Sequence, residues 1–228
     1  MVSKSPRHIA IILDGNRRYA RKIGMQPWKG HEFGLKKLEE LFKWCQDTGV
    51  RELTLYAFST ENFKRAKREV NYLFSLFRHE VEKIKYGKGI FKDGIRFNFI
   101  GRLGMFPDSM RKPMLEIMQK TKKRNRLIVN FAMAYGGRQE IADAVNKAVK
   151  KIKNKKIDEK MIAKNLYLKS EPDIVIRPGG EKRMSNFLLW QSSYAELFFL
   201  KKLWPEFTKE DLVNIIKEFN QRQRRFGK

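Results

Sequence analysis

The chain has 228 residues and a mass of 27.1 kDa, and a chain of this length can bury about 70% of its unfolded surface around one core. Its single cysteine, Cys45, excludes a disulfide framework within the chain and any metal site built from several cysteines. Lys and Arg number 50 against 25 Asp and Glu, which gives a net charge of +25. This charge predicts an anionic partner, and nucleic acid, an anionic membrane surface and phosphate-bearing metabolites all fit it.

The apolar segments are too short to cross a bilayer, which needs about 20 consecutive apolar residues. The first of them, residues 9–13, is followed at once by Asp14 and a basic segment, unlike the pattern of a cleavable signal peptide. We therefore expect a soluble, cytoplasmic protein.

The first half of the chain alternates between predicted strands and predicted helices. Residues 7–13 form a continuous apolar run, which is typical of a strand buried on both faces of a parallel sheet. Apolar residues at helical spacing predict a helix over 31–48, and Gly49 stands where a helix commonly ends. A second strand is predicted over 53–58 and a second long helix over 70–84.

The alternation continues to the end of the chain. Further strands are predicted over 95–100, 127–134, 173–177 and 197–200, and further helices over 109–122, 139–152, 158–165 and 208–222. The last helix begins with Thr208 and Asp211, the spacing of a capping box. We expect one α/β domain over residues 1–228, with a mostly parallel six-stranded sheet flanked by helices.

Four loops that follow predicted strands are unusually polar: residues 14–18, 59–65, 135–138 and 177–183. Ligands of open parallel sheets bind at the carboxyl ends of the strands, and arginine, asparagine, hydroxyl and glycine-rich segments can hold phosphates there. Neither G-x-G-x-x-G after the first strand nor the P-loop pattern is present. Considered alone, Asp14 is explained equally well as a cap of the following helix as it is as a ligand-binding residue. In the same way, Gly179-Gly180 is explained equally well as a simple turn.

Together, the segments resemble the cis-prenyltransferases, the undecaprenyl diphosphate synthase family. The resemblance rests on residues 8–20, 53–62, 130–138, 174–191, 194–196 and 224–227, in the order and spacing of the family. It implies a hydrophobic tunnel beside the sheet, a homodimer or a related heterodimer, and Mg²⁺ as cofactor. The implied reaction joins isopentenyl diphosphate to an allylic prenyl diphosphate with cis geometry, giving a longer polyprenyl diphosphate and releasing diphosphate.

The resemblance also assigns roles to individual residues. The allylic diphosphate would lie against Gly15, Asn16, Arg17 and Arg18, with Phe63 and Arg65 nearby, and isopentenyl diphosphate against Arg177, Arg183 and Ser185. Asp14 and Glu196 would bind Mg²⁺ through hard carboxylate oxygens. His31, Ser59 and Asn62 match positions near the reacting carbons, with Asn62 and Ser59 as the candidates for steering proton loss. The tunnel would be lined by Leu73, Phe74, Leu76 and Phe77 together with Leu127 and Val129.

Two further expectations concern partners. The terminal Arg225 and Gly227 would cross the dimer interface to the diphosphates of the partner's site, whereas arginines after a helix are otherwise a solvated tail. The positive charge would favour peripheral contact with an anionic membrane surface.

Some residues depart from the family pattern, and other functions remain open. Lys29 stands near a position where the family often has arginine, Lys182 replaces a histidine seen in some members, and Pro178 replaces a hydroxyl residue. A catalytically silent subunit of a heterodimer would lack Asp14, which is present. A nucleic-acid-binding domain would rest on charge alone, so we expect no nucleic acid. Transfer to an acceptor without a diphosphate stays possible.

Overall fold

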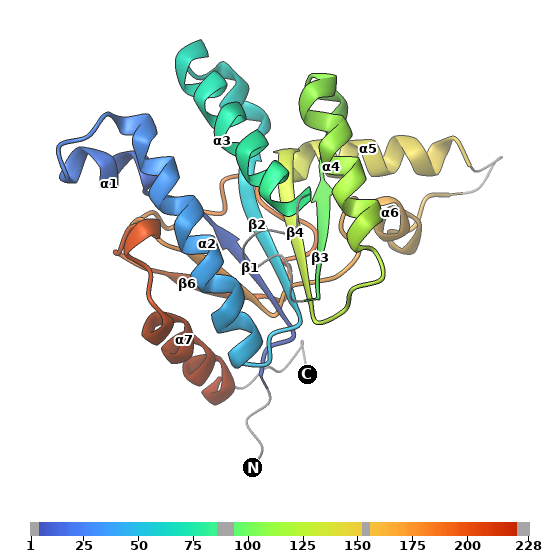
Figure 1. Ribbon diagram of the computed structural model, residues 1–228. Coiled ribbons are helices and arrows are strands. Elements are labelled where there is room, and N and C mark those ends of the chain that lie inside the picture. The colour runs from blue at the N-terminus through green and yellow to red at the C-terminus, as the bar shows by residue number, and fades with distance from the viewer. Residues whose placement is uncertain (1–4, 86–93, 152–155, 223–228) are drawn as a thin grey trace.

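Six strands form one parallel sheet, which explains the nearly continuous apolar runs of the sequence. In the computed structural model, which describes residues 5–85, 94–151 and 156–222, the strand order is β3-β4-β2-β1-β5-β6 (Figure 1). The strands are β1 (His8–Ile12), β2 (Glu52–Ser59), β3 (Ile95–Ile100), β4 (Leu127–Tyr135), β5 (Ile174–Arg177) and β6 (Glu196–Phe199). The predicted fold class is confirmed.

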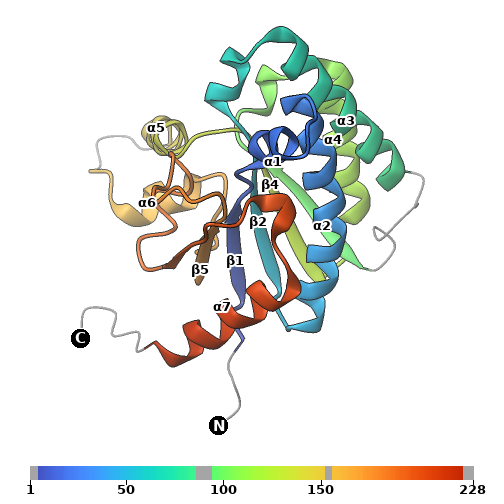
Figure 2. The ribbon, with the colours of Figure 1, turned by 90° about the vertical axis from the view of Figure 1, so that its left-hand side faces the viewer.

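Helices cover both faces of this sheet. They are α1 (Asn16–Lys22), α2 (Gly30–Asp47), α3 (Lys67–Lys85), α4 (Asp108–Thr121), α5 (Gly137–Val149), α6 (Glu159–Asn165) and α7 (Lys209–Gln221). Short 3₁₀ turns, η1 (Pro27–Lys29), η2 (Thr60–Lys64), η4 (Leu103–Met105) and η5 (Trp204–Glu206), connect them. Figures 1 and 2 show α2, α3, α4 and α7 on one face and α5 and α6 on the other.

Alternate residues of the central strand β1 enter two separate apolar cores. Ile9 and Ile11 of β1 pack in the larger core, together with α2, α4 and α7. Ala10 and Ile12 pack in the smaller core, where Phe187 and Leu188 cover the other face. Because β1 is buried on both sides, it holds the centre of the sheet in place and fixes the position of the loop that follows it.

The helix boundaries lie within a few residues of those predicted. The capping box at α7 is present, with Thr208 N–H donating to Asp211 Oδ2 (2.9 Å) and Asp211 N–H donating to Thr208 Oγ1 (3.3 Å). The predicted end of the helix over 139–152 falls outside the described residues. Among the helices of the described segments, none is long and apolar enough to cross a membrane.

The topology places one crevice at the carboxyl ends of the central strands. The chain passes from β1 to β2 on one side of β1 and later returns to β5 on the other side. At such a switch point the loops after the two neighbouring strands separate, and ligands of open α/β sheets bind between them. The loops after β1, β2 and β5 are three of the four polar loops of the sequence.

Candidate active site

Asp14 lies directly after β1 and accepts hydrogen bonds from two arginines. Its Oδ2 accepts from Arg177 Nη2 (2.8 Å) and its Oδ1 from Arg18 Nη2 (3.0 Å). Arg18 Nη1 also donates to the carbonyl of Gly179 (2.5 Å). Gly179 has φ of +102°, and a Cβ there would lie 2.7 Å from the Arg18 guanidinium and 3.2 Å from the Asp14 carboxyl carbon. The glycine therefore lets the loop after β5 approach Asp14.

Arg177 connects Asp14 to the loop after β5. Its side chain is only 5% exposed, and besides Asp14 it donates to Ser185 Oγ (2.7 Å) and to the carbonyl of Arg183. The Arg183 side chain is 60% exposed and forms an ion pair with Glu181. A buried guanidinium thus fixes this loop, while a second guanidinium stays accessible to an anionic ligand.

A basic cavity of about 340 Å³ adjoins Asp14. It is lined by Leu13, Asp14, Gly15, Asn16, Arg17, Arg18, Arg21, His31 and Arg65. Because α1 has only seven residues, the four arginines and not the helix dipole dominate the attraction for an anion.

Glu69 of α3 sits behind these arginines, and the sequence reasoning missed it. Its side chain is 7% exposed, accepts from Arg65 Nη1 at 2.9 Å, and lies 3.8 Å from Arg17 Nη1 and 3.6 Å from His31 Nε2. The spacing of Arg65 and Glu69, four residues apart, is the only local signal for the cluster.

His31 lines both cavities of the site and is held neutral by its surroundings. Burial, followed by the charges of Arg65 and Arg17, lowers its pKa from 6.5 to about 4, although Glu69 acts in the opposite direction. Its Nε2 makes no hydrogen bond. At neutral pH the imidazole can therefore accept or donate a hydrogen bond without carrying charge.

Ser59 and Asn62 lie together at the end of β2. The Ser59 N–H donates to Asn62 Oδ1 (3.1 Å), and both residues line the larger cavity. Phe63 instead packs against the rings of Phe58 and Phe106, with centroids 4.9 Å and 5.4 Å away, and is not among the residues that line the two cavities. The expected contact of Phe63 with substrate therefore stays a prediction.

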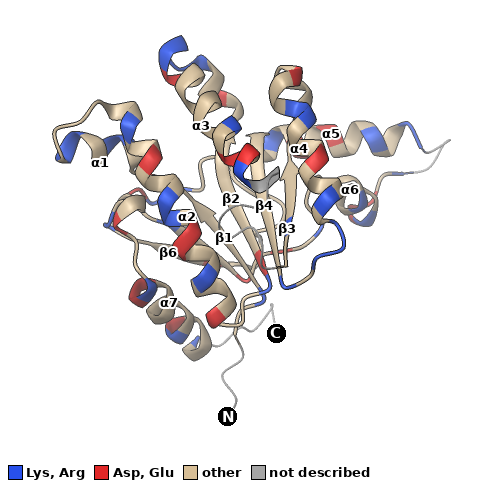
Figure 3. Cartoon of the chain, viewed as in Figure 1, with Lys and Arg blue, Asp and Glu red and all other residues tan. Residues whose placement is uncertain are grey.

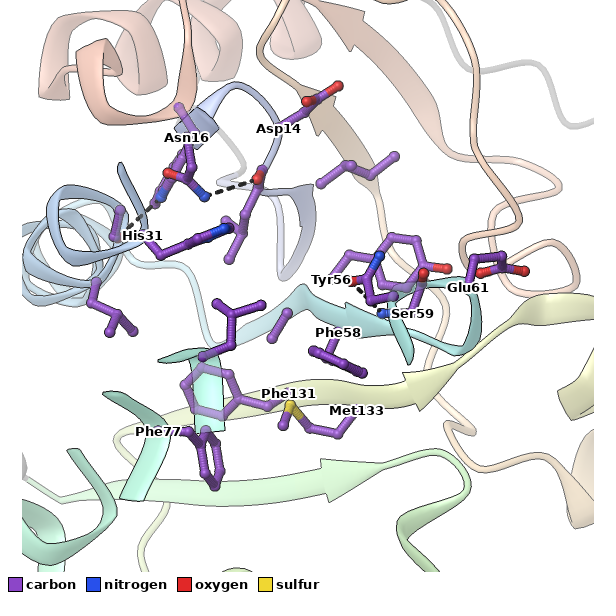
Figure 4. A pocket seen from close by; sticks show the side chains of 18 of the residues that line it. Asp14, Asn16, His31, Tyr56, Phe58, Ser59, Glu61, Phe77, Phe131 and Met133 are labelled. Carbon is purple, nitrogen blue, oxygen red and sulfur yellow. Dashed lines mark hydrogen bonds between the residues drawn. The ribbon is translucent and has the colours of Figure 1, made fainter. Parts of the chain in front are cut away.

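A larger cavity of about 690 Å³ extends from the polar groups into an apolar region. Figure 4 shows Asp14, Asn16 and His31 at one end and Phe77, Phe131 and Met133 at the other. Leu73, Phe74, Leu76 and Phe77 of α3 line it as expected. Leu127 and Val129 do not, because both are fully buried in the core, and Phe131 and Met133 line the cavity from farther along the same face of β4.

The single chain does not bring Glu196 to Asp14. Glu196 begins β6 and pairs through Ile174 of β5 with Ile9 at the start of β1, whereas Asp14 follows the end of β1. At about 3.3 Å per residue, the backbone positions of the two residues are offset by roughly 15 Å along the strands. Glu196 instead accepts from Arg222 Nη1. Arg225 and Gly227 lie outside the described residues.

No group of three or more His, Cys, Asp or Glu side chains that could hold a metal occurs in residues 5–85, 94–151 and 156–222. Lys and Arg are distributed over all the helices and do not form one stripe (Figure 3).

The chemistry that the geometry supports is recognition of a phosphorylated ligand with an apolar body. The diphosphate end would face arginines and the body would enter the larger cavity.

Comparison with known proteins gives a consistent result. The family model described as putative undecaprenyl diphosphate synthase matches residues 12–227. A tritrans,polycis-undecaprenyl-diphosphate synthase (geranylgeranyl-diphosphate specific) of Thermococcus kodakarensis is 51% identical, over 98% of this chain and 87% of that protein. An isoprenyl transferase of Thermus thermophilus is 41% identical, over 98% and 89%.

Solved structures agree with the sequence relatives. Lavandulyl diphosphate synthase from Lavandula x intermedia, in complex with dimethylallyl diphosphate, has a TM-score of 0.91 at 30% identity, covering 98% of this chain and 99% of that one. A probable undecaprenyl diphosphate synthase from Campylobacter jejuni has a TM-score of 0.84 at 36% identity, covering 99% and 100%.

Proposed function

The chain belongs to the undecaprenyl diphosphate synthase family of prenyltransferases, and on this premise we propose that its site binds the diphosphates of two substrates in separate places. The enzyme condenses isopentenyl diphosphate with an allylic prenyl diphosphate, so that the prenyl chain grows and diphosphate is released. The observation that supports two separate sites is the series of contacts from Ser185 through Arg177 to Asp14, which connects the loops after β5 and β1.

The allylic diphosphate occupies the basic cavity, and its prenyl tail enters the apolar one. Arg17, Arg18 and Arg65 lie around the first cavity, where a diphosphate would replace part of their contact with Asp14 and Glu69. The larger cavity shares Asp14, Asn16 and His31 with the basic one, so that one ligand can occupy both. Apolar side chains of α3 and β4 then shield the tail from water.

Isopentenyl diphosphate binds on the other side of Asp14. Arg183 and Ser185 supply the contacts, and Arg177 holds their loop in place from below. The carbon end of isopentenyl diphosphate then points toward the mouth of the apolar cavity, where the allylic carbon lies. Each charge-assisted hydrogen bond to this diphosphate contributes about 1.5–3 kcal/mol.

In the reaction the allylic carbon–oxygen bond breaks, its electrons leave with the diphosphate, a carbon–carbon bond forms and a proton is lost. Arg17, Arg18 and Arg65 stabilise the charge that develops on the leaving diphosphate. The backbone N–H of Ser59 donates to the side-chain oxygen of Asn62, which leaves the Asn62 amide N–H groups for the substrate. Neutral His31 borders the same space. These three residues are the candidates that guide the proton.

Mg²⁺ fits Asp14 as its protein ligand. Mg²⁺ is commonly bound by one or two carboxylates together with substrate phosphates, and the Asp14 carboxylate, 27% exposed, lines both cavities. When bound, the ion would neutralise charge on the leaving diphosphate. The position of Glu196 favours Asp14 alone as the ligand from this chain.

The primer we propose is geranylgeranyl diphosphate, because relatives about half identical to this chain carry that specificity in their names. The test is incorporation of radiolabelled isopentenyl diphosphate with primers of several lengths and Mg²⁺. Equal use of all primers would contradict the preference, and no incorporation with any of them would contradict the activity.

We also propose a homodimer. Within the described residues the edge strand β6 pairs with β5 alone, and Tyr194, just before it, and Leu197, within it, are exposed at 64% and 39%. An apolar patch at a sheet edge favours a partner chain. A single species with twice the chain mass in sedimentation velocity is expected, and a monomer at micromolar concentration would contradict it.

Peripheral contact with an anionic membrane is the third proposal. Ile23 and Met25 are exposed beside the basic Arg21 and Lys22 at the end of α1, a combination that suits a lipid surface. We expect binding to vesicles that contain anionic lipid and little binding to zwitterionic ones. Binding that ignores both lipid charge and salt would contradict it.

A further inference from the structure

The backbone directly after Arg183 takes an uncommon course. Ser185, Asn186 and Leu188 have φ of 48°, 66° and 44°, the left-handed region that residues other than glycine seldom adopt and that asparagine tolerates best. Such conformations persist only where the surrounding structure holds them. Phe187 and Leu188, which follow Asn186, are fully buried and anchor the carboxyl-terminal side of this segment in the core.

Asn186 supplies the anchor on the other side through three hydrogen bonds to the start of α5. Its carbonyl accepts from Gly137 N–H (2.7 Å), its Oδ1 from Arg138 N–H (2.9 Å), and its Nδ2 donates to Gln139 Oε1 (3.0 Å). Two of the N–H groups that a helix start leaves without partners are thereby satisfied. A Cβ on Gly136 would lie 2.6 Å from Asn186 Nδ2 and 2.2 Å from Gln139 Oε1, so this contact requires glycine there.

The neighbouring residue carries this geometry into the diphosphate pocket. Ser185 precedes Asn186 and accepts from Arg177 Nη1 at 2.7 Å, and the same nitrogen donates to the Arg183 carbonyl. The other Arg177 nitrogen donates to Asp14. The orientation of the Ser185 hydroxyl therefore depends on a backbone conformation that Asn186 maintains.

We propose that Asn186 is a positioning residue for the donor diphosphate: by clamping residues 185–188 to the start of α5 it holds Ser185 and Arg183 where the diphosphate of isopentenyl diphosphate binds. This inference rests on the proposed function. It assigns Asn186 no contact with the reacting atoms. Loss of the clamp lets the backbone leave the left-handed region and moves the Ser185 hydroxyl away from Arg177.

The test compares Asn186→Ala and Asn186→Gly with a matched control, Asn165→Ala. Asn165 also makes two side-chain hydrogen bonds at a helix end, to Met161 and Lys151, but lies on α6, away from the cavities. We expect Asn186→Ala to raise the KM for isopentenyl diphosphate about tenfold, with the KM for the allylic primer changed less than about twofold. Asn186→Gly keeps the left-handed conformation accessible but loses the side-chain bonds, and we expect a smaller increase.

A merely structural role gives a different pattern. If Asn186→Ala lowers the melting temperature as Asn165→Ala does and leaves the ratio of the two KM values unchanged, the proposal is wrong. Wild-type protein without activity would contradict the proposed function and not this inference. In that case calorimetric titration with inorganic pyrophosphate decides: weaker binding by Asn186→Ala than by wild type supports the clamp, and equal binding overturns it.

Discussion

Asp14→Asn removes one negative charge at the junction of the two cavities while keeping the shape of the side chain. Its carboxylate accepts from Arg177 at 2.8 Å and from Arg18 at 3.0 Å. The Arg177 bond is partly buried and contributes about 1.5–3 kcal/mol, whereas the Arg18 side chain is 42% exposed and its bond contributes less than about 1 kcal/mol. Since Arg177 keeps Ser185 and the Arg183 carbonyl as acceptors, we expect the free energy of unfolding to fall by no more than about 3 kcal/mol.

The effect on turnover should be much larger than the effect on stability. Removing one electrostatic group of an active site typically slows turnover by about 10²–10³-fold, and Asp14 is also the proposed Mg²⁺ ligand. The assay measures turnover at saturating substrates and Mg²⁺, beside urea unfolding. Asp143→Asn is the control, because Asp143 is equally exposed at 26% and accepts two bonds from Arg102. Near-wild-type turnover of Asp14→Asn, or equal losses in both variants, would refute the reasoning.

Three other predictions follow from the same geometry. Arg183→Ala should raise the KM for isopentenyl diphosphate about tenfold or more and that for the primer little, with the exposed Lys182→Ala as control; equal increases in both KM values would reject the division of sites. The pKa of His31 is lowered from 6.5 to about 4 in the folded protein, so between pH 4 and pH 6.5 the unfolded chain binds more protons than the folded one. The free energy of unfolding should therefore fall by up to about 3 kcal/mol as the pH drops from 6.5 to 4. Urea unfolding of His31→Gln should show a shallower pH dependence, and an unchanged one would contradict a buried neutral imidazole. Phe77→Ala should lengthen the products seen by thin-layer chromatography by enlarging the apolar cavity, whereas Leu115→Ala, at a side chain 46% exposed, should not; an unchanged product distribution for Phe77→Ala would place the chain stop elsewhere.

The sheet could be predicted because its strands are buried on both faces. β1 is five consecutive buried residues, and such a run between polar segments has few other interpretations. The proximity of the polar loops after β1, β2 and β5 could also be predicted, because parallel strands end at one edge of the sheet. The juxtaposition of Asp14, Arg177 and Ser185 is the result.

Other parts of the site depend on information that one sequence does not carry. Glu69 meets Arg17 and His31, which lie on α1 and α2 far from it in the chain, so their contact follows from helix packing. The placement of Glu196 depends on the register of β6, which a short edge strand does not reveal. The left-handed backbone at Ser185 follows from the contacts of Asn186 with α5 and not from the local residue types.

The most direct test of the central claim is a binding measurement that separates the two substrates. Wild-type protein is titrated with a non-hydrolysable thiolo analogue of the allylic diphosphate and, separately, with isopentenyl diphosphate, in the presence of Mg²⁺, and the titrations are repeated with Arg65→Ala and Arg183→Ala. Arg65 lines the basic cavity as well as the larger one, whereas Arg183 lines only the larger one. The account predicts that Arg65→Ala weakens the allylic analogue more than isopentenyl diphosphate and that Arg183→Ala does the reverse. Equal weakening of both ligands by each variant would contradict two distinct diphosphate sites.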